Sequence, residues 1–143
     1  MNVGIVGLGF MGKIHLKNYL ALGCNVKISD TNPGARQIAE ENNCDFFPDY
    51  KEFLGTVDGV SVCVPTLMHF EIAKECLKNT NVLVEKPITA TLEEARKLVR
   101  LATENKRILM VGHIERYNPA VIPVAHDSQS GQHKAQECAT GIS

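Results

Sequence analysis

The fold is decided by the stretch "VGIVGLGFMGKIHLKNYL", residues 3–20. Its first part is a short apolar run, typical of a strand buried on both faces of a parallel sheet. Its second part has the spacing of one helix face, at Gly12, Leu16, Tyr19 and Leu20. Gly7, Gly9 and Gly12 form a G-x-G-x-x-G pattern between the two parts. The stretch therefore predicts a strand, a tight glycine turn and a helix.

The rest of the chain continues this alternation. Six apolar runs read as strands, at residues 2–7, 25–30, 44–47, 57–65, 81–87 and 107–113. Helical patterns fill the intervals, and the connections between elements are short. This order predicts an α/β fold of the Rossmann type, a doubly wound parallel sheet of about six strands with helices on both faces.

Two helix starts are predicted from local residue types. Thr66 follows Pro65 and is expected to cap the helix after the fourth strand. Thr91 and Glu94 have the spacing of a capping box before the helix that follows the fifth strand. That last helix is expected to bury four residues, Ala95, Leu98, Val99 and Ala102.

Composition narrows the class of protein. A chain of 143 residues with 44% hydrophobic residues predicts one globular domain, and a net charge of −1 favours neither nucleic acid nor membrane as a partner. No apolar run is long enough to span a bilayer, and the start does not resemble a signal peptide, so a cytoplasmic location is expected. The five cysteines have no metal-ligand spacing, which predicts no metal site, and an odd number in a cytosolic chain favours reduced, mostly buried thiols.

The glycine pattern points to a dinucleotide. The first glycine permits a tight turn, the second lets the backbone approach a pyrophosphate, and the third lets helix and strand pack closely. Asp30 ends the second strand about 20 residues further on, where a carboxylate would hold the adenosine ribose. Its charge would repel a ribose 2′-phosphate, and Arg36 is expected on a solvated helix face, so NAD is favoured over NADP. A methyltransferase that binds S-adenosylmethionine is the alternative within this fold.

A second set of polar residues follows the fourth and fifth strands. Thr66 and His69 come after one, and Glu85 and Lys86 after the other, so all four are expected at the carboxyl edge of the sheet. Thr66 also fits a plain cap, and His69 also fits an ordinary first-turn helix residue. The pair Glu85–Lys86 would be a surface charge pair elsewhere. Its place between an apolar strand and Pro87 favours a functional role.

Four segments together resemble one family. They are "VGIVGLGFMGKIH" (3–15), "VCVPTLMH" (62–69), "VEKPITATLEEARKL" (84–98) and "VGHIERYNPAV" (111–121). The chain over residues 2–122 is similar to the N-terminal domain of the glucose–fructose oxidoreductase, inositol dehydrogenase and rhizopine-catabolism (Gfo/Idh/MocA) family. The last segment is most similar to the branch that includes UDP-N-acetylglucosamine 3-dehydrogenases.

The resemblance implies a nicotinamide-dependent dehydrogenase of a sugar, sugar nucleotide or cyclitol. It assigns the pyrophosphate to five residues, Gly7, Gly9, Phe10, Met11 and Gly12. It gives Asp30 the adenosine ribose, and it places Pro65, Thr66 and His69 along the cofactor cleft. Glu85 would contact the nicotinamide side, and Lys86 would touch a substrate oxygen and assist proton transfer. Full-length relatives are expected to be homo-oligomers.

The chain departs from the family after about Val124. Residues 1–123 are expected to form the dinucleotide-binding domain and 124–143 an irregular tail, with the family's C-terminal substrate domain absent. Three hypotheses follow: a truncated or frameshifted dehydrogenase, a stand-alone NAD-binding module or sensor, and a non-enzymatic interaction domain that has lost its cofactor. Weak or no turnover is expected from this chain alone.

Overall fold

The structure, a computed structural model, describes residues 1–119. It divides into two units, Met1–Gly112 and a second that begins at His113. The first unit holds a parallel sheet with these strands: β1 Asn2–Val6, β2 Asn25–Ser29, β3 Asp45–Phe47, β4 Gly59–Val62, β5 Asn81–Val84 and β6 Leu109–Val111. The strand order β3-β2-β1-β4-β5-β6 confirms the doubly wound Rossmann-type sheet. The order reverses between β1 and β4, and in such folds ligands bind at the carboxyl ends of the strands near that point.

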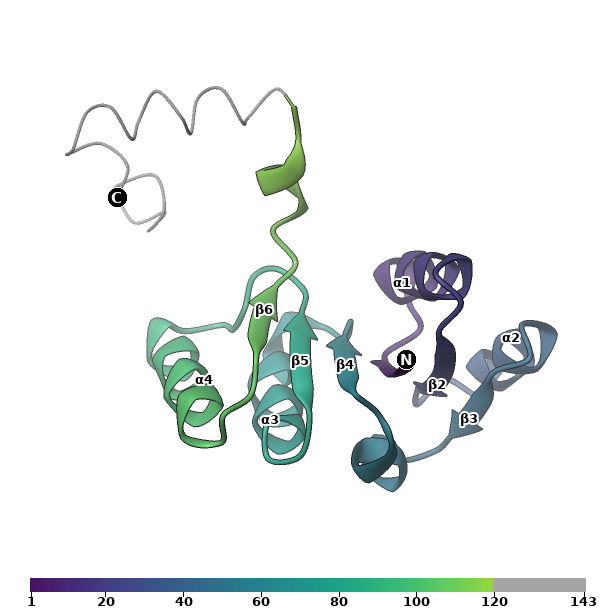
Figure 1. Cartoon of the computed structure of the whole chain (residues 1–143), viewed down its shortest axis with the longest axis horizontal. Coiled ribbons are helices and arrows are strands. Elements are labelled where there is room, and N and C mark those ends of the chain that lie inside the picture. The colour runs from purple at the N-terminus through teal and green to yellow at the C-terminus, as the bar shows by residue number, and fades with distance from the viewer. Residues whose placement is uncertain (120–143) are drawn as a thin grey trace. The chain divides into compact units, whose positions relative to one another are not determined.

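Helices connect the strands of the first unit. Their bounds are α1 Phe10–Ala21, α2 Gly34–Glu41, the 3-10 helix η1 Tyr50–Thr56, α3 Thr66–Cys76 and α4 Leu92–Glu104. In Figure 1, α1 and α2 lie beside β2 and β3, and α3 and α4 lie beside β5 and β6. Each helix therefore packs on strands next to it in the chain, as short crossover connections require.

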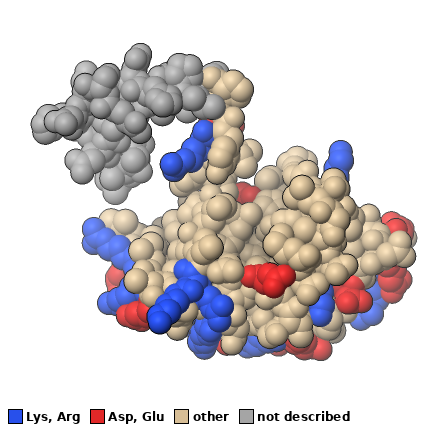
Figure 2. Space-filling view, viewed as in Figure 1, with Lys and Arg blue, Asp and Glu red and all other residues tan. Residues whose placement is uncertain are grey.

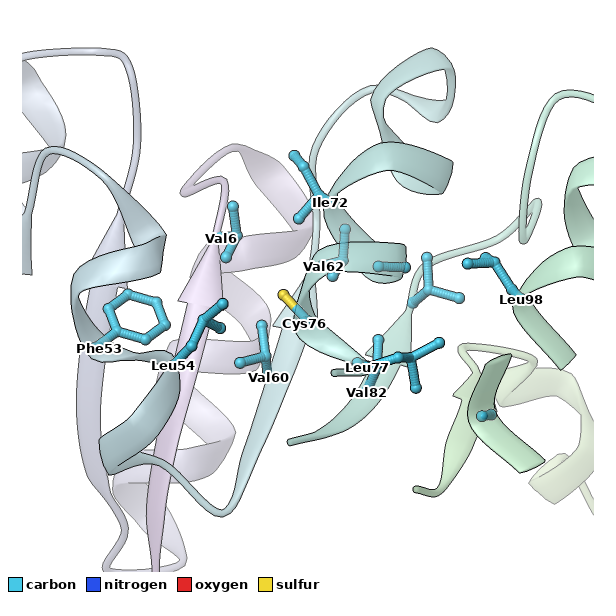
Figure 3. Close-up of a cluster of buried hydrophobic side chains, with 13 residues drawn as sticks. Val6, Phe53, Leu54, Val60, Val62, Ile72, Cys76, Leu77, Val82 and Leu98 are labelled. Carbon is cyan, nitrogen blue, oxygen red and sulfur yellow. The ribbon is translucent and has the colours of Figure 1, made fainter. Parts of the chain in front are cut away.

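Two apolar clusters hold these layers together. The larger one joins β1, β4 and β5 to η1, α3 and α4, and Figure 3 shows its side chains, among them Phe53, Val62, Cys76, Leu77 and Leu98. The smaller one joins β1 and β2 to α1 and α2, through Ile5, Leu16, Ile28, Ala35 and Ala39. Both clusters are built from the continuous apolar runs and helical stripes of the sequence, because a parallel sheet is covered on two faces.

The predicted capping box at the start of α4 is confirmed. The hydroxyl of Thr91 accepts a hydrogen bond from the Glu94 N–H at 3.3 Å, and the Glu94 carboxylate accepts one from the Thr91 N–H at 3.2 Å. Thr91→Ala should lower the free energy of unfolding by about 1 kcal/mol, measured by urea denaturation. Thr103→Ala removes a hydroxyl from the far end of the same helix, where it bonds only the Val99 carbonyl, and should change stability by less than about 0.5 kcal/mol. Equal losses for the two variants would contradict the capping role.

Two local predictions are wrong. Thr66 does not cap α3: Pro65 occupies the N-cap position without a side-chain hydrogen bond, and Thr66 is the first helical residue. Val99 is 57% exposed, whereas Leu98 and Ala102 on the same helix are buried. The reason is that only a narrow stripe of α4 faces the sheet. Leu98 and Ala102, one turn apart, lie on this stripe, whereas Val99 lies beside it.

The second unit is described only as far as Pro119. It contains the short 3-10 helix η2 Ile114–Tyr117. The predicted boundary at residue 123 and the predicted irregular tail lie outside the described residues. Within residues 1–119, none of the helices is long and apolar enough to cross a membrane.

Charged side chains are interspersed on the face that Figure 2 shows. Lys and Arg alternate with Asp and Glu along its lower edge, while most of the surface above them in the first unit is uncharged. Opposite charges also pair along helices, as in Lys74 with Glu71 and Lys97 with Glu93. These pairs lie on exposed helix faces, where each contributes little to stability.

Candidate cofactor site

The glycine turn begins at Gly7, directly after β1. Its backbone has φ of +90°, which favours glycine, and its N–H donates to the Ser29 carbonyl at 2.8 Å. A side chain here would come within 2.8 Å of the Cys63 carbonyl oxygen at the end of β4. Gly7 therefore lets three strand ends, those of β1, β2 and β4, meet closely.

The other two glycines of the pattern differ in what surrounds them. A Cβ at Gly12 would overlap the carbonyl oxygen of Gly7, so α1 packs on the turn only because this position has no side chain. A Cβ at Gly9 would have no atom within 4 Å. Gly9 is also the N-cap of α1. The open space around it leaves room for a ligand beside the first N–H groups of the helix.

Asp30 follows β2 and faces this turn. Its Oδ2 accepts a hydrogen bond from the Leu8 N–H, and its Oδ1 accepts one from the Asn32 N–H at 2.7 Å. Two backbone donors thus fix the orientation of the carboxylate. Each oxygen keeps a further lone pair that could accept a hydroxyl proton.

A cavity of about 490 Å³ opens beside these residues. It is lined by the glycine turn, by residues after β2 and β4 and by the start of η1, among them Gly7, Gly9, Asp30, Tyr50, Cys63 and Pro65. These segments meet at the carboxyl ends of β1, β2 and β4, where the strand order reverses. The volume and place fit an elongated ligand bound across the glycine turn.

His69, Glu85 and Lys86 are not among the residues that line this cavity. Lys86 is exposed after β5, and Glu85 is 6% exposed with its carboxylate turned toward α1. His69 is 1% exposed, and its ring nitrogens lie 2.9 Å from the Pro87 carbonyl and 2.8 Å from the Val64 carbonyl. His69 thus bridges the loops that carry Pro65 and Lys86, whereas its expected place along the cofactor cleft stays a prediction.

Comparison with known proteins agrees with this geometry. The profile of the GFO_IDH_MocA family, described as "Oxidoreductase family, NAD-binding Rossmann fold", matches residues 1–113. The chain belongs to the GFO_IDH_MocA family. It is thereby a member of an oxidoreductase family with an NAD-binding domain, which sets aside the methyltransferase alternative.

Several dehydrogenases of the family are similar to this chain. UDP-N-acetylglucosamine 3-dehydrogenase of Acidithiobacillus ferrooxidans is 36% identical over 123 residues, which is 85% of this chain and 39% of that protein. Its crystal structure covers 92% of this chain and 42% of its own, with a TM-score of 0.81. Inositol 2-dehydrogenase of Rubrobacter xylanophilus is 32% identical over 90% of this chain and 40% of its own length. This chain therefore spans about two fifths of the relatives that it matches.

A third relative bears on the choice of cofactor. The structure of KijD10, a 3-ketoreductase of Actinomadura kijaniata, contains NADP and TDP-benzene. It is 25% identical, has a TM-score of 0.80, and covers 92% of this chain and 42% of its own. Membership of the GFO_IDH_MocA family alone therefore leaves the choice between NAD and NADP to the residues of the site.

A buried polar chain behind the site was not predicted from the sequence. Tyr19 and His15 of α1, Ser61 of β4 and Glu85 are linked by hydrogen bonds of 2.6, 3.1 and 2.8 Å. The signals were a serine inside the apolar run of β4, and a histidine and a tyrosine four residues apart on the helix face that packs on it. They are weak signals, because each residue type is also common at surfaces.

Cys63 borders the cavity as an inert thiol. Burial, with a smaller contribution from the negative charge of Glu85, raises its pKa to about 12, and burial raises that of Cys76 to about 12 as well. Near neutral pH, the thiolate fraction of both cysteines is therefore far below that of a thiol with the ordinary pKa of 9.0. Cys63 and Cys76 should therefore resist iodoacetamide while the half-buried Cys24 is alkylated, as read by peptide mass spectrometry. Faster alkylation of Cys63 than of Cys24 would contradict this description.

Proposed function

We propose that this chain binds NAD and forms the cofactor-binding part of a dehydrogenase that acts on a sugar, a sugar nucleotide or a cyclitol. The observation that carries the proposal is the cavity where the strand order reverses, with Gly9 and the fixed carboxylate of Asp30 both in its lining. Support for the substrate class comes from the relatives, which are named as dehydrogenases of UDP-N-acetylglucosamine and of inositol.

The glycine turn would hold the pyrophosphate. Gly7 and Gly9 allow close approach, and Phe10, Met11 and Gly12 form the first turn of α1, whose N–H groups carry partial positive charge. Phe10 is 82% exposed, so its side chain leaves the backbone N–H groups open to a ligand. An anion at this helix start would satisfy donors that the helix itself cannot.

Asp30 would accept hydrogen bonds from the two hydroxyls of the adenosine ribose. A 2′-phosphate in the same place would meet the carboxylate charge directly. Arg36 is exposed on α2 and lies over the ring of Phe46, 4.8 Å from its centroid. These features favour NAD over NADP, although one relative is known with NADP.

The substrate would react at the carboxyl end of β5. The nicotinamide, when bound, supplies or accepts the hydride. The ammonium group of Lys86 is exposed there and would hold the reacting oxygen and move its proton. Pro65 and Thr66, after β4, would border the cofactor on the way to that point.

Calorimetric titration tests the cofactor proposal. NADH should bind with measurable heat, NADPH at least about tenfold more weakly, and S-adenosylmethionine without detectable heat. Addition of NAD with UDP-sugars or with inositol then separates an active dehydrogenase, which produces NADH absorbance, from a binding module, which does not. Absence of heat with both NADH and NADPH would overturn the proposed function.

A further inference from the structure

The buried hydrogen-bond network of Tyr19, Ser61 and His15 ends at Glu85, the residue that directly precedes Lys86. The Tyr19 hydroxyl lies 2.6 Å from the Ser61 oxygen, which lies 3.1 Å from Nδ1 of His15. Nε2 of His15 lies 2.8 Å from Oε1 of Glu85. Ser61 is 1% exposed, and the side chains of His15 and Glu85 are 12% and 8% exposed. Burial of a carboxylate to this extent requires hydrogen-bond partners, and the chain supplies them.

The protons of this hydrogen-bond network can be assigned, because each of them must have an acceptor. With a neutral ring, Tyr19 donates to Ser61, Ser61 donates to Nδ1 of His15, and Nε2–H donates to Glu85. A doubly protonated ring would leave one hydroxyl proton without an acceptor among these groups. Burial raises the pKa of Tyr19, which keeps its hydroxyl a donor. The arrangement therefore leaves Glu85 as the charged end of the chain.

The second oxygen of Glu85 contacts the loop that carries Lys86. Oε2 accepts a hydrogen bond from the Lys86 N–H at 3.3 Å, while the Glu85 N–H donates to the Val62 carbonyl at 3.0 Å. The same residue is thus bonded to α1 through its side chain, to β4 through its backbone, and to Lys86. Because His15 holds Oε1 of the Glu85 carboxylate in place, Oε2 can fix the backbone of Lys86.

Gly112 leaves the space in which this carboxylate lies. A Cβ at Gly112 would come within 2.9 Å of Oε1 and 3.1 Å of the carboxyl carbon of Glu85. The N–H of Gly112 donates to the Val84 carbonyl at 2.8 Å, so its backbone is anchored beside β5 and cannot retreat easily. A methyl group at this position would displace the carboxylate, because the three atoms nearest to it all belong to Glu85.

We propose that His15 and Glu85, with Gly112 leaving room for the carboxylate, form a positioning site that fixes the Lys86 loop at the carboxyl edge. Lys86 acts on the substrate, and His15 acts through Glu85 on the loop that carries Lys86. This role rests on the proposed function, since it concerns the lysine assigned to the reacting oxygen.

Nuclear magnetic resonance of the whole chain tests the positioning site in two ways. Hydrogen exchange of the Lys86 amide reports the loop without any cofactor, and the signal of the Lys86 side chain reports its response to NADH. His15→Leu, which removes the N–H donor, should speed exchange of this amide about tenfold and at least halve the NADH-induced shift. The affinity for NADH should change by less than about threefold, because the cavity lining is untouched.

Matched variants separate positioning from loss of folding. His15→Gln keeps an N–H donor near the position of Nε2 and should restore most of the protection. Gly112→Ala should reproduce the effect of His15→Leu by displacing the carboxylate, and it serves if His15→Leu does not fold. Tyr19→Phe removes only the outermost hydroxyl and should leave Lys86 unchanged.

Two outcomes distinguish the two proposals. If Gly112→Ala and His15→Leu fold and leave both Lys86 signals as in the parent chain, the positioning site is wrong. If NADH does not bind the parent chain, the proposed function fails, while the exchange rate of the Lys86 amide still decides the positioning claim. The ring ¹⁵N signals of His15 give a third check, and a protonated Nδ1 in the parent chain at neutral pH would overturn the proton assignment.

Discussion

Replacement of Gly12 by alanine is expected to lower the free energy of unfolding by about 2–3 kcal/mol. The new methyl group would overlap the carbonyl oxygen of Gly7, and both partners belong to backbone that other contacts hold in place. Alanine favours a helix by about 1 kcal/mol over glycine, which offsets only part of this cost. Urea denaturation followed by circular dichroism measures the change.

Gly9→Ala is the matched control, because it adds the same methyl group to another glycine of the same pattern. Nothing lies within 4 Å of its Cβ, and its φ of −69° is allowed for alanine. Stability should therefore change by less than about 1 kcal/mol. NADH affinity should nevertheless fall at least about tenfold, since the methyl group enters space that the pyrophosphate is proposed to occupy. Stability losses of equal size at the two glycines would contradict this division of roles.

Removal of the charge of Asp30 is expected to weaken NADH binding by about 10- to 100-fold, the loss that follows from a hydrogen bond to a charged group. Asp30→Asn retains one oxygen that can accept the Leu8 or the Asn32 N–H, so the loop should keep its conformation. NADPH should lose much less affinity than NADH, because the repulsion of the 2′-phosphate disappears. Parallel calorimetric titrations with both nucleotides measure the two changes.

Asp58→Asn is the control for this charge change. Asp58 precedes β4, at the amino ends of the strands, and its Oδ2 accepts a hydrogen bond from the Asn2 N–H at 2.8 Å. It loses the same charge and a similar backbone contact, at the edge of the sheet away from the cavity. The affinities of Asp58→Asn for NADH and for NADPH should match those of the parent chain. If Asp30→Asn kept the parent chain's ratio of NADH affinity to NADPH affinity, the charge of Asp30 would not be what favours NAD over NADP.

The fold was accessible from the sequence because its signals are local. Apolar runs, glycine turns and the Thr91 capping box each specify a few neighbouring residues, and alternation of strand and helix then fixes a doubly wound sheet. Gly7 and Gly12 could be predicted for the same reason, since a positive φ and a close approach leave glycine as the fitting residue.

The rest of the site depends on contacts between distant segments. Glu85 meets His15 across 70 positions of the chain, and Gly112 meets Glu85 across a sheet pairing. No local pattern indicates which buried polar groups will be partners, because these depend on register and helix rotation together. His69 illustrates the limit: its place on the first turn of α3 was predicted, but its burial between two carbonyl groups was not.

Amide chemical-shift mapping with NADH shows directly whether NAD binds where the strand order reverses, as we propose. The largest shifts are expected at Gly9, at Asp30 and in the loop around Thr66, with little change at the amino ends of the strands. A second hollow lies at that opposite edge, beside Asn25 and Asn43. Shifts concentrated there, or none at saturating NADH, would show that the cofactor does not bind at the carboxyl ends of β1, β2 and β4.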